Sequence, residues 1–170
     1  MTDLIFQSSL SRSYHDALAR LVFFNGGQRA AETAIAEVVD RYGTPSIVAG
    51  DRGLRVAVSR RDDVQCVFAL APGRREPVLA GMVLFLRTSI QVIEILHIAV
   101  ADHCRRTRRS GSEVVIALVQ TVRDSAQRLR GVERLTMLYL QGRTFQIVVR
   151  PAAERHRPND DRLPAAPLSS

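Results

Sequence analysis

The stretch that decides the fold is residues 91–130, QVIEILHIAVADHCRRTRRSGSEVVIALVQTVRDSAQRLR. Its first part, Gln91–Val100, is apolar on both faces, which is typical of a central β-strand. Apolar residues then recur at the spacing of one helix face over 114–130, before Gly131. A basic segment, Arg105–Glu113, lies between the two patterns. This order predicts a strand, a turn, and a helix that crosses over to a parallel neighbouring strand.

The basic segment has the composition of an anion site. Free backbone N–H groups at a helix N-terminus and the positive end of the helix dipole attract phosphate to the same place. Arginine adds a guanidinium that binds phosphate oxygens in a fixed geometry. We therefore expect Arg108 and Arg109, which adjoin Gly111, to bind phosphate. For Arg105 and Arg106, a solvated loop or contact with a nucleic-acid backbone explains the charge as well.

The rest of the chain alternates between helical and strand-like periodicity. We expect helices over Ser13–Phe24 and Gln28–Tyr42, and strands over Thr2–Gln7, Leu54–Ser59, Val64–Ala71, Val78–Leu86, Leu135–Leu140 and Phe145–Val149. These patterns predict an α/β (α+β) fold with a mixed, mostly antiparallel sheet. The C-terminal strand would form a sheet edge, through which a homodimer could pair across a two-fold axis.

Composition limits the class of protein. A chain of 170 residues with 46% hydrophobic residues forms one globular domain, here residues 1–150, followed by a Pro- and Arg-rich tail, 151–170, which we expect to be disordered. No apolar run is long enough to span a bilayer, and the N-terminus lacks the basic region of a signal peptide, so a cytoplasmic location is expected.

Charge is concentrated in the second part of the chain. The formal net charge is +7, and all 24 basic residues are arginines. Residues 101–170 carry 13 arginines and seven acids, whereas residues 1–100 carry 11 and ten. Aromatic residues make up only 5% of the chain and do not interleave with these arginines, which argues against a stacking surface for single-stranded nucleic acid.

The order of the elements resembles the GNAT superfamily, the acyl-CoA-dependent N-acyltransferases, over roughly Val64–Leu140. Three segments carry the resemblance. Phe68-Ala-Leu-Ala, a Pro-Gly turn and Val78-Leu-Ala-Gly-Met-Val-Leu look like the second and third strands of the family. Leu96-His-Ile-Ala-Val100 looks like its fourth strand, and Arg108-Arg-Ser-Gly-Ser-Glu113 resembles its phosphate motif, [Gln/Arg]-x-x-Gly-x-[Gly/Ala].

The resemblance implies a fold and a cofactor. The fold would be a sheet splayed between its fourth and fifth strands, with helices on both faces and the pantetheine arm of acetyl-CoA, or another acyl-CoA, lying in the gap. The backbone of Ile98 and Val100 would bond the arm, and the pyrophosphate would sit on the N–H groups from Arg109 to Glu113. The cofactor-binding residues so implied are Ile98, Ala99, Val100, Arg108, Arg109, Ser110, Gly111, Ser112 and Glu113.

The resemblance also implies an activity, transfer of an acetyl or other acyl group to an amine of a small molecule or protein. Glu94 would be the general base, on the same strand face as Leu96, Ile98 and Val100 if alternation is strict; the other interpretation is a glutamate paired with an arginine. Strict alternation puts His97 on the opposite face, as a core histidine. Tyr139 is a candidate general acid, or a packed strand tyrosine.

Two departures from the family pattern define the alternatives. Glu113 stands where the family has Gly or Ala, and its carboxylate would repel a pyrophosphate at close range. The helix and tyrosine that follow the fifth strand of the family are replaced by an immediate strand, Phe145–Val149. The alternatives are a catalytically degenerate GNAT-fold binding or regulatory module and, third, a basic nucleic-acid-binding protein.

Overall fold

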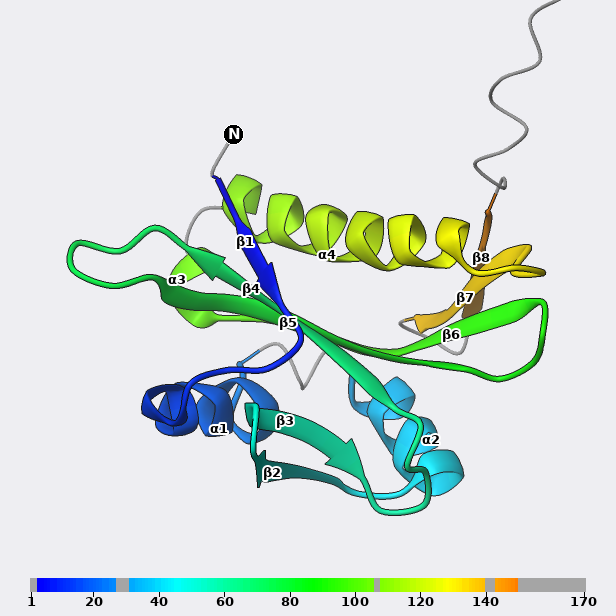
Figure 1. The fold of residues 1–170 in the computed structure, drawn as a ribbon, viewed down its shortest axis with the longest axis horizontal. Helices are drawn as coiled ribbons and strands as arrows, with labels where there is room; N and C mark the ends of the chain where they lie inside the picture. Colours follow the sequence, from blue (N-terminus) through cyan, green and yellow to red (C-terminus); the bar gives the residue numbers. More distant parts are fainter. Residues whose placement is uncertain (1–2, 27–30, 106–107, 140–142, 150–170) are drawn as a thin grey trace, which may run out of the picture.

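A computed structural model of the chain describes residues 3–26, 31–105, 108–139 and 143–149 (Figure 1). Side chains are described for these residues except 108–110, 138–139 and 143–144. Arg106 and the tail over 151–170 lie outside the described residues, so the expectations for them stay predictions.

A six-stranded mixed sheet forms the centre of the fold, with the strand order β1-β4-β5-β6-β7-β8. Every neighbouring pair is antiparallel except β6 and β7, which are parallel. The strands are β1 (Ile5–Gln7), β4 (Gln65–Ala71), β5 (Val78–Arg87), β6 (Val92–Val100), β7 (Arg134–Tyr139) and β8 (Arg143–Val148). The mostly antiparallel sheet, the central place of β6 and the parallel connection from β6 to β7 are confirmed.

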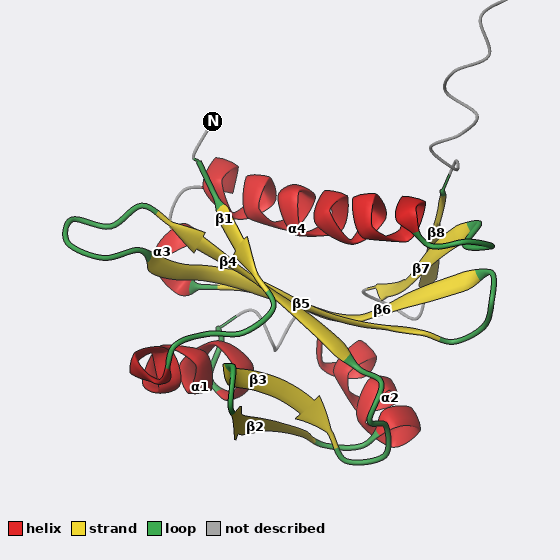
Figure 2. Cartoon of the chain, in the orientation of Figure 1, coloured by secondary structure: helices red, strands yellow, loops and turns green. Residues whose placement is uncertain are grey.

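Helices cover both faces of this sheet, as expected (Figure 2). The long helix α4 (Arg108–Arg128) lies along one face. The opposite face carries a short 3-10 turn (Arg12–Tyr14), α1 (His15–Phe23), α2 (Glu32–Tyr42) and a separate hairpin of β2 (Pro45–Gly50) and β3 (Gly53–Val58). A short helix α3 (Asp102–Arg105) follows β6. Among the described residues, no helix combines the length and apolar character that crossing a bilayer requires.

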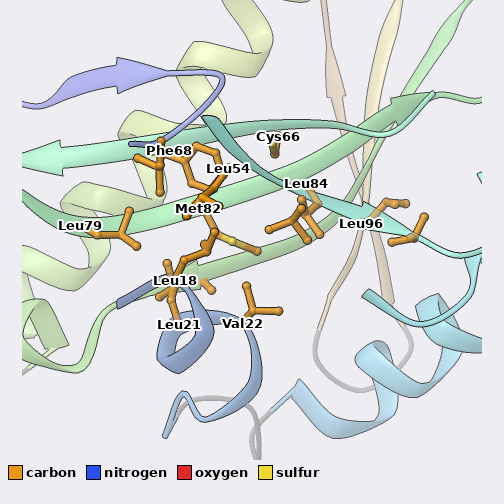
Figure 3. Packing of buried hydrophobic residues seen from close by; sticks show 14 of the residues in the cluster. Leu18, Leu21, Val22, Leu54, Cys66, Phe68, Leu79, Met82, Leu84 and Leu96 are labelled. Atoms are coloured by element: carbon orange, nitrogen blue, oxygen red, sulfur yellow. The ribbon is translucent and has the colours of Figure 1, made fainter. Parts of the chain in front are cut away.

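Two hydrophobic cores result, one on each face of the sheet. Leu118, Val122 and Ala126 of α4 are fully buried against one face. On the other face, Leu18 of α1 packs with Phe68 and other residues of the sheet (Figure 3). β5 contributes to both cores and is buried over eight of its ten residues, so the two layers are fixed to each other through it.

Gly81 of β5 allows the helix to approach the sheet. A Cβ atom at this position would lie 2.8 Å from the carbonyl oxygen of Ala99 and 2.9 Å from Cγ1 of Val114. It would also lie 3.3 Å from Cδ1 of Leu118. Because these atoms belong to the neighbouring strand and to the buried face of α4, a side chain here must push one of them away.

The first strand of the β2–β3 hairpin, β2, is an element that the sequence pattern missed, whereas β3 corresponds to the strand expected over Leu54–Ser59. Gly and Pro are residue types that end helices, and Gly43 is the C-cap of α2, with a φ of 95°. However, Pro45 also begins a strand, and the segment Gly50-Asp51-Arg52-Gly53 is the hairpin's turn. Gly followed by polar residues between two short apolar runs could have predicted it.

β8 is an edge strand, as expected, although it begins two residues earlier than the pattern indicated. Phe145 and Val148 are 51% and 66% exposed. The homodimer through this edge stays a prediction.

We expect Gly81→Ala to lower the free energy of unfolding by about 1–3 kcal/mol, because the added methyl group overpacks the contact between α4 and the sheet. Gly50→Ala is the matched control: its Cβ would meet only the Gly53 carbonyl, at 3.9 Å, and should change stability by less than about 0.5 kcal/mol. Urea denaturation measures both. Equal effects of the two substitutions would contradict this role for Gly81.

Candidate functional site

The pairing between β6 and β7 covers only part of β6. Paired residues run from Val92 with Arg134 to Ile95 with Met137, whereas β6 continues to Val100. The last five residues of β6 therefore extend beyond the ladder with β7. On its other edge, β6 stays paired with β5 up to the pair of Val100 with Gly81.

The register with β5 fixes which backbone groups of β6 face the edge that extends beyond the ladder with β7. The N–H of Ala101 donates to the carbonyl of Ala80, so this residue pair is hydrogen-bonded. In an antiparallel ladder bonded and non-bonded pairs alternate. Val100 opposite Gly81 and Ile98 opposite Val83 are therefore non-bonded pairs, whose N–H and C=O groups point away from β5. Ala99, between them, is turned toward β5.

Two side chains already bind the carbonyl oxygen of Val100. The buried amide of Asn25, after α1, donates its Nδ2 at 2.7 Å, and Arg105 of α3 donates its Nε at 3.1 Å. The adjacent Gly26 lies against Asp102, whose Oδ1 would be 3.4 Å from a Cβ atom there. The end of α1 is thus attached to the end of β6. The pair Asn25-Gly26 by itself indicates only the end of a helix, so its contact with β6 could not be predicted from the sequence.

The basic segment is mostly helical, which corrects the expected turn over 105–113. Helix α4 begins at Arg108 and not at Val114, and α3 contains Arg105. Only the first turn of a helix has free N–H groups. A phosphate on the helix N-terminus would therefore meet the N–H groups of Arg108 to Gly111, while those of Ser112 and Glu113 bond within the helix.

The structure places only part of the basic motif, 108–113, in side-chain detail. The side chains of Arg108, Arg109 and Ser110 lie outside the described part. Gly111 packs against α3, where a Cβ would find Arg105 and Cys104 atoms at 3.7 Å, which is ordinary contact. Ser112 and Glu113 are exposed. The repulsion expected from Glu113 is reduced by this placement, because its side chain starts from the second turn of the helix.

A β-bulge in β6 overturns the expected strict alternation. Leu84 pairs with His97 but Phe85 pairs with Ile95, so both Leu96 and His97 lie opposite Leu84. The phase of the strand changes at this point. As a result Glu94, Leu96 and His97 face the α1–α2 layer, whereas Ile98 and Val100 face α4. The expectation that Glu94 shares a face with Ile98 and Val100, opposite His97, was wrong.

Glu94 lies in a polar cluster with α2. The hydroxyl of Tyr42 donates to Oε2 at 2.8 Å, and the guanidinium of Arg41 donates to Oε1 at 3.3 Å. The Glu94 side chain is 16% exposed, and Arg41 also pairs with Glu37 at 2.6 Å. Burial, and then the bond to Glu94, raise the pKa of the Tyr42 phenol. The alternative interpretation, a glutamate paired with an arginine, is confirmed as a contact. The partner Tyr42 was not foreseen.

His97 lines a cavity of about 50 Å³ between the sheet and the α1–α2 layer, with Val38 and Val39 of α2 on the other side. Burial, and then the charge of Arg105, lower its pKa to about 4. The imidazole is therefore neutral near pH 7. Its backbone belongs to the bulge, just beyond the last residue of β6 that pairs with β7.

Tyr139 ends β7, as expected from the sequence, but its side chain lies outside the described part. Its role as general acid stays a prediction. Among the described residues, no group of three or more His, Cys, Asp or Glu side chains is arranged to hold a metal ion.

No family model matches this chain, and a search of curated proteins finds no match. The residues and their arrangement are therefore the basis of the functional argument.

The depressed pKa of His97 predicts a dependence of stability on pH. The unfolded state takes up a proton near pH 6.5 and the folded state only near pH 4, so stability is complete above pH 6.5 and falls as pH drops from 6.5 to 4. The loss amounts to at most about 3 kcal/mol. Urea denaturation of the protein and of His97→Gln across this range should give curves that converge at low pH. Parallel curves would show that His97 is not buried in its neutral form.

Proposed function

We propose that the protein is an N-acyltransferase that transfers an acetyl or other acyl group from acyl-CoA to an amine. The single observation that carries the proposal is the edge of β6 beyond Ile95, which has no strand partner among the described residues. There the backbone groups of Ile98 and Val100 point away from β5, beyond the last pair with β7. A pantetheine arm, with its amide groups, has the polar spacing to bond such an edge as an additional strand would.

The start of α4 supports the placement of the cofactor's phosphates. It follows β6 and α3 directly, and its first turn contains Arg108, Arg109 and Gly111. A helix N-terminus offers N–H donors and a positive dipole end, and Gly111 leaves the surface free of a side chain. Arg105, whose Nε bonds the Val100 carbonyl, adds positive charge between the two parts of the proposed site.

For catalysis, the bulge and Glu94 are the relevant features. A bulge leaves one residue outside the regular ladder and redirects the groups around it, here at Leu96 and His97. A strand N–H at this position would stabilise the oxyanion of the tetrahedral intermediate. Glu94 would accept the proton of the attacking amine, directly or through water, while Tyr42 holds its carboxylate in place.

The alternative is a binding module of the same fold that has lost catalysis. The observation that favours it is the state of Glu94, because both of its carboxylate oxygens have a partner, Arg41 for one and Tyr42 for the other. A base must release such partners, or share them, before it takes a proton. In this alternative, acyl-CoA binds but no amine is acylated.

Gly111→Asp should abolish binding of CoA and acetyl-CoA, because a carboxylate then occupies the helix N-terminus where the pyrophosphate is expected. The fold should remain stable, since an acidic residue in the first helical turn is favourable. Isothermal titration calorimetry at physiological salt measures the affinity, and thermal unfolding measures the stability.

The matched control is Gln120→Glu, which makes the same change of charge at an exposed position on α4, about two and a half turns further along the helix. It should leave CoA affinity within about two-fold of the parent protein, because charges more than a Debye length from the ligand are screened. If Gly111→Asp and Gln120→Glu bind CoA equally well, the cofactor does not sit at this helix start.

Glu94→Gln separates the enzyme from the binding module. If Glu94 is the base, the acylation rate for a responsive amine should fall about 100-fold or more, with CoA affinity unchanged. Tyr42→Phe should have a smaller effect, since it removes only a positioning hydrogen bond. An unchanged rate in Glu94→Gln across pH would exclude Glu94 as the base, and absence of acylation in the parent protein despite CoA binding would favour the module.

A further inference from the structure

An open hollow of about 800 Å³ lies on the surface of the layer formed by α1, α2 and the β2–β3 hairpin. Its wall comes from the end of α1 at Val22 and Phe23, from one side of α2, and from the start of β2 at Thr44 and Pro45. This volume is within the range of cavities that bind small organic molecules.

The hollow narrows toward the sheet. Val22, Ile35, Val39 and Pro45 line both the hollow and the cavity of about 50 Å³ beneath it, so the two adjoin. The inner cavity ends on Met82, Leu84, Leu96 and His97 of the sheet. Three of these, Met82, Leu84 and Leu96, point into the layer together with Val22 in Figure 3. With His97 neutral, the inner end carries no charge near pH 7.

The mouth of the hollow is charged, whereas its inner end is apolar. Of the described residues that line the hollow, the charged ones are both acidic, Glu32 and Asp40, one near each end of α2. The chain as a whole carries 24 arginines against 17 acids, so an acidic mouth runs against its average charge. The Arg60 guanidinium donates to the backbone carbonyl of Asp40 at 2.5 Å and partly offsets the second carboxylate. Glu32 should therefore contribute more than Asp40 to the negative potential at the mouth.

From this combination we infer that the hollow binds a small organic cation, an amine with an apolar body. The apolar part lies against Ile35 and Val39, with its end toward Leu96 and His97. The ammonium group stays hydrated at the mouth beside Glu32, and Asp40 lies about 12 Å further along α2. Burying the apolar body supplies the affinity, and the two carboxylates select a cation over a neutral or anionic molecule of the same shape.

An amine is also the acceptor that acyl transfer requires, so this inference rests on the proposed function. Binding is tested in the absence of CoA, so that its failure is distinguishable from a failure to bind acyl-CoA. Three probes of equal chain length test it: octylammonium chloride, octan-1-ol and sodium octanoate, each titrated into the full-length protein at neutral pH and low salt. We expect octylammonium to bind about five-fold more tightly than octanol, and octanoate to bind most weakly, given the modest strength of exposed charge pairs.

Two kinds of variant locate the site. Glu32→Gln should weaken octylammonium binding about three-fold and leave octanol binding unchanged, with Asp40→Asn having a smaller effect in the same direction. Ala36→Trp, at an exposed position in the wall of the hollow, should remove binding of all three probes. Asp124→Asn on α4, across the sheet, is the control for the loss of one carboxylate and should change nothing.

The charge comparison does not depend on the bulky variant, so a poorly folded Ala36→Trp protein leaves the test intact. Octylammonium affinity that falls with Glu32→Gln but not with Asp124→Asn supports the inference. Equal affinities for the three probes, no measurable binding of octylammonium at millimolar concentration, or equal effects of Glu32→Gln and Asp124→Asn would overturn it.

Discussion

The arrangement depends on one constraint: backbone N–H and C=O groups in a protein interior need partners. Within the part of the chain that the structure describes, β6 has a strand partner on both edges over only part of its length. Beyond Ile95 the edge that faces β7 extends past the ladder. The fold satisfies the carbonyl of Val100 with the side chains of Asn25 and Arg105. The end of α1 and the helix α3 contact this end of β6 through these two side chains, and α4 follows α3 in the chain. The proposed cofactor site lies there.

The layers on either side of the sheet fix this edge in place. Gly81 allows α4 to lie directly on β5, so the helix start is held at a defined height above the end of β6. On the other face, α2 contacts β6 through Tyr42, whose hydroxyl binds Glu94. The bulge at Leu96 and His97 turns both of these side chains toward the same layer. The two faces of β6 therefore serve different purposes: one packs on α4, and the other meets the hollow and the polar cluster.

Much of this could be predicted from periodicity, and the rest could not, for identifiable reasons. Long apolar patterns located the central strands and α4. The start of α4 was misplaced because Arg108-Arg-Ser-Gly111 resembles a turn, although a glycine costs little in the first turn of a helix. Nothing in the residue types Leu96 and His97 indicates a bulge, because the bulge is determined by the pairing of β6 with β5. For Glu94 the sequence predicted a charged partner, but only tertiary packing selects Arg41 and Tyr42.

The backbone amides of β6 test most directly whether the edge beyond Ile95 is the proposed seat of the acyl-CoA arm. Hydrogen exchange of assigned backbone amides, measured by NMR with and without saturating acetyl-CoA, should show new protection at Ile98 and Val100. Ala99, whose N–H already points to β5, should not change. Protection that leaves Ile98 and Val100 unaffected, or that appears at Ala99 alone, would contradict the account.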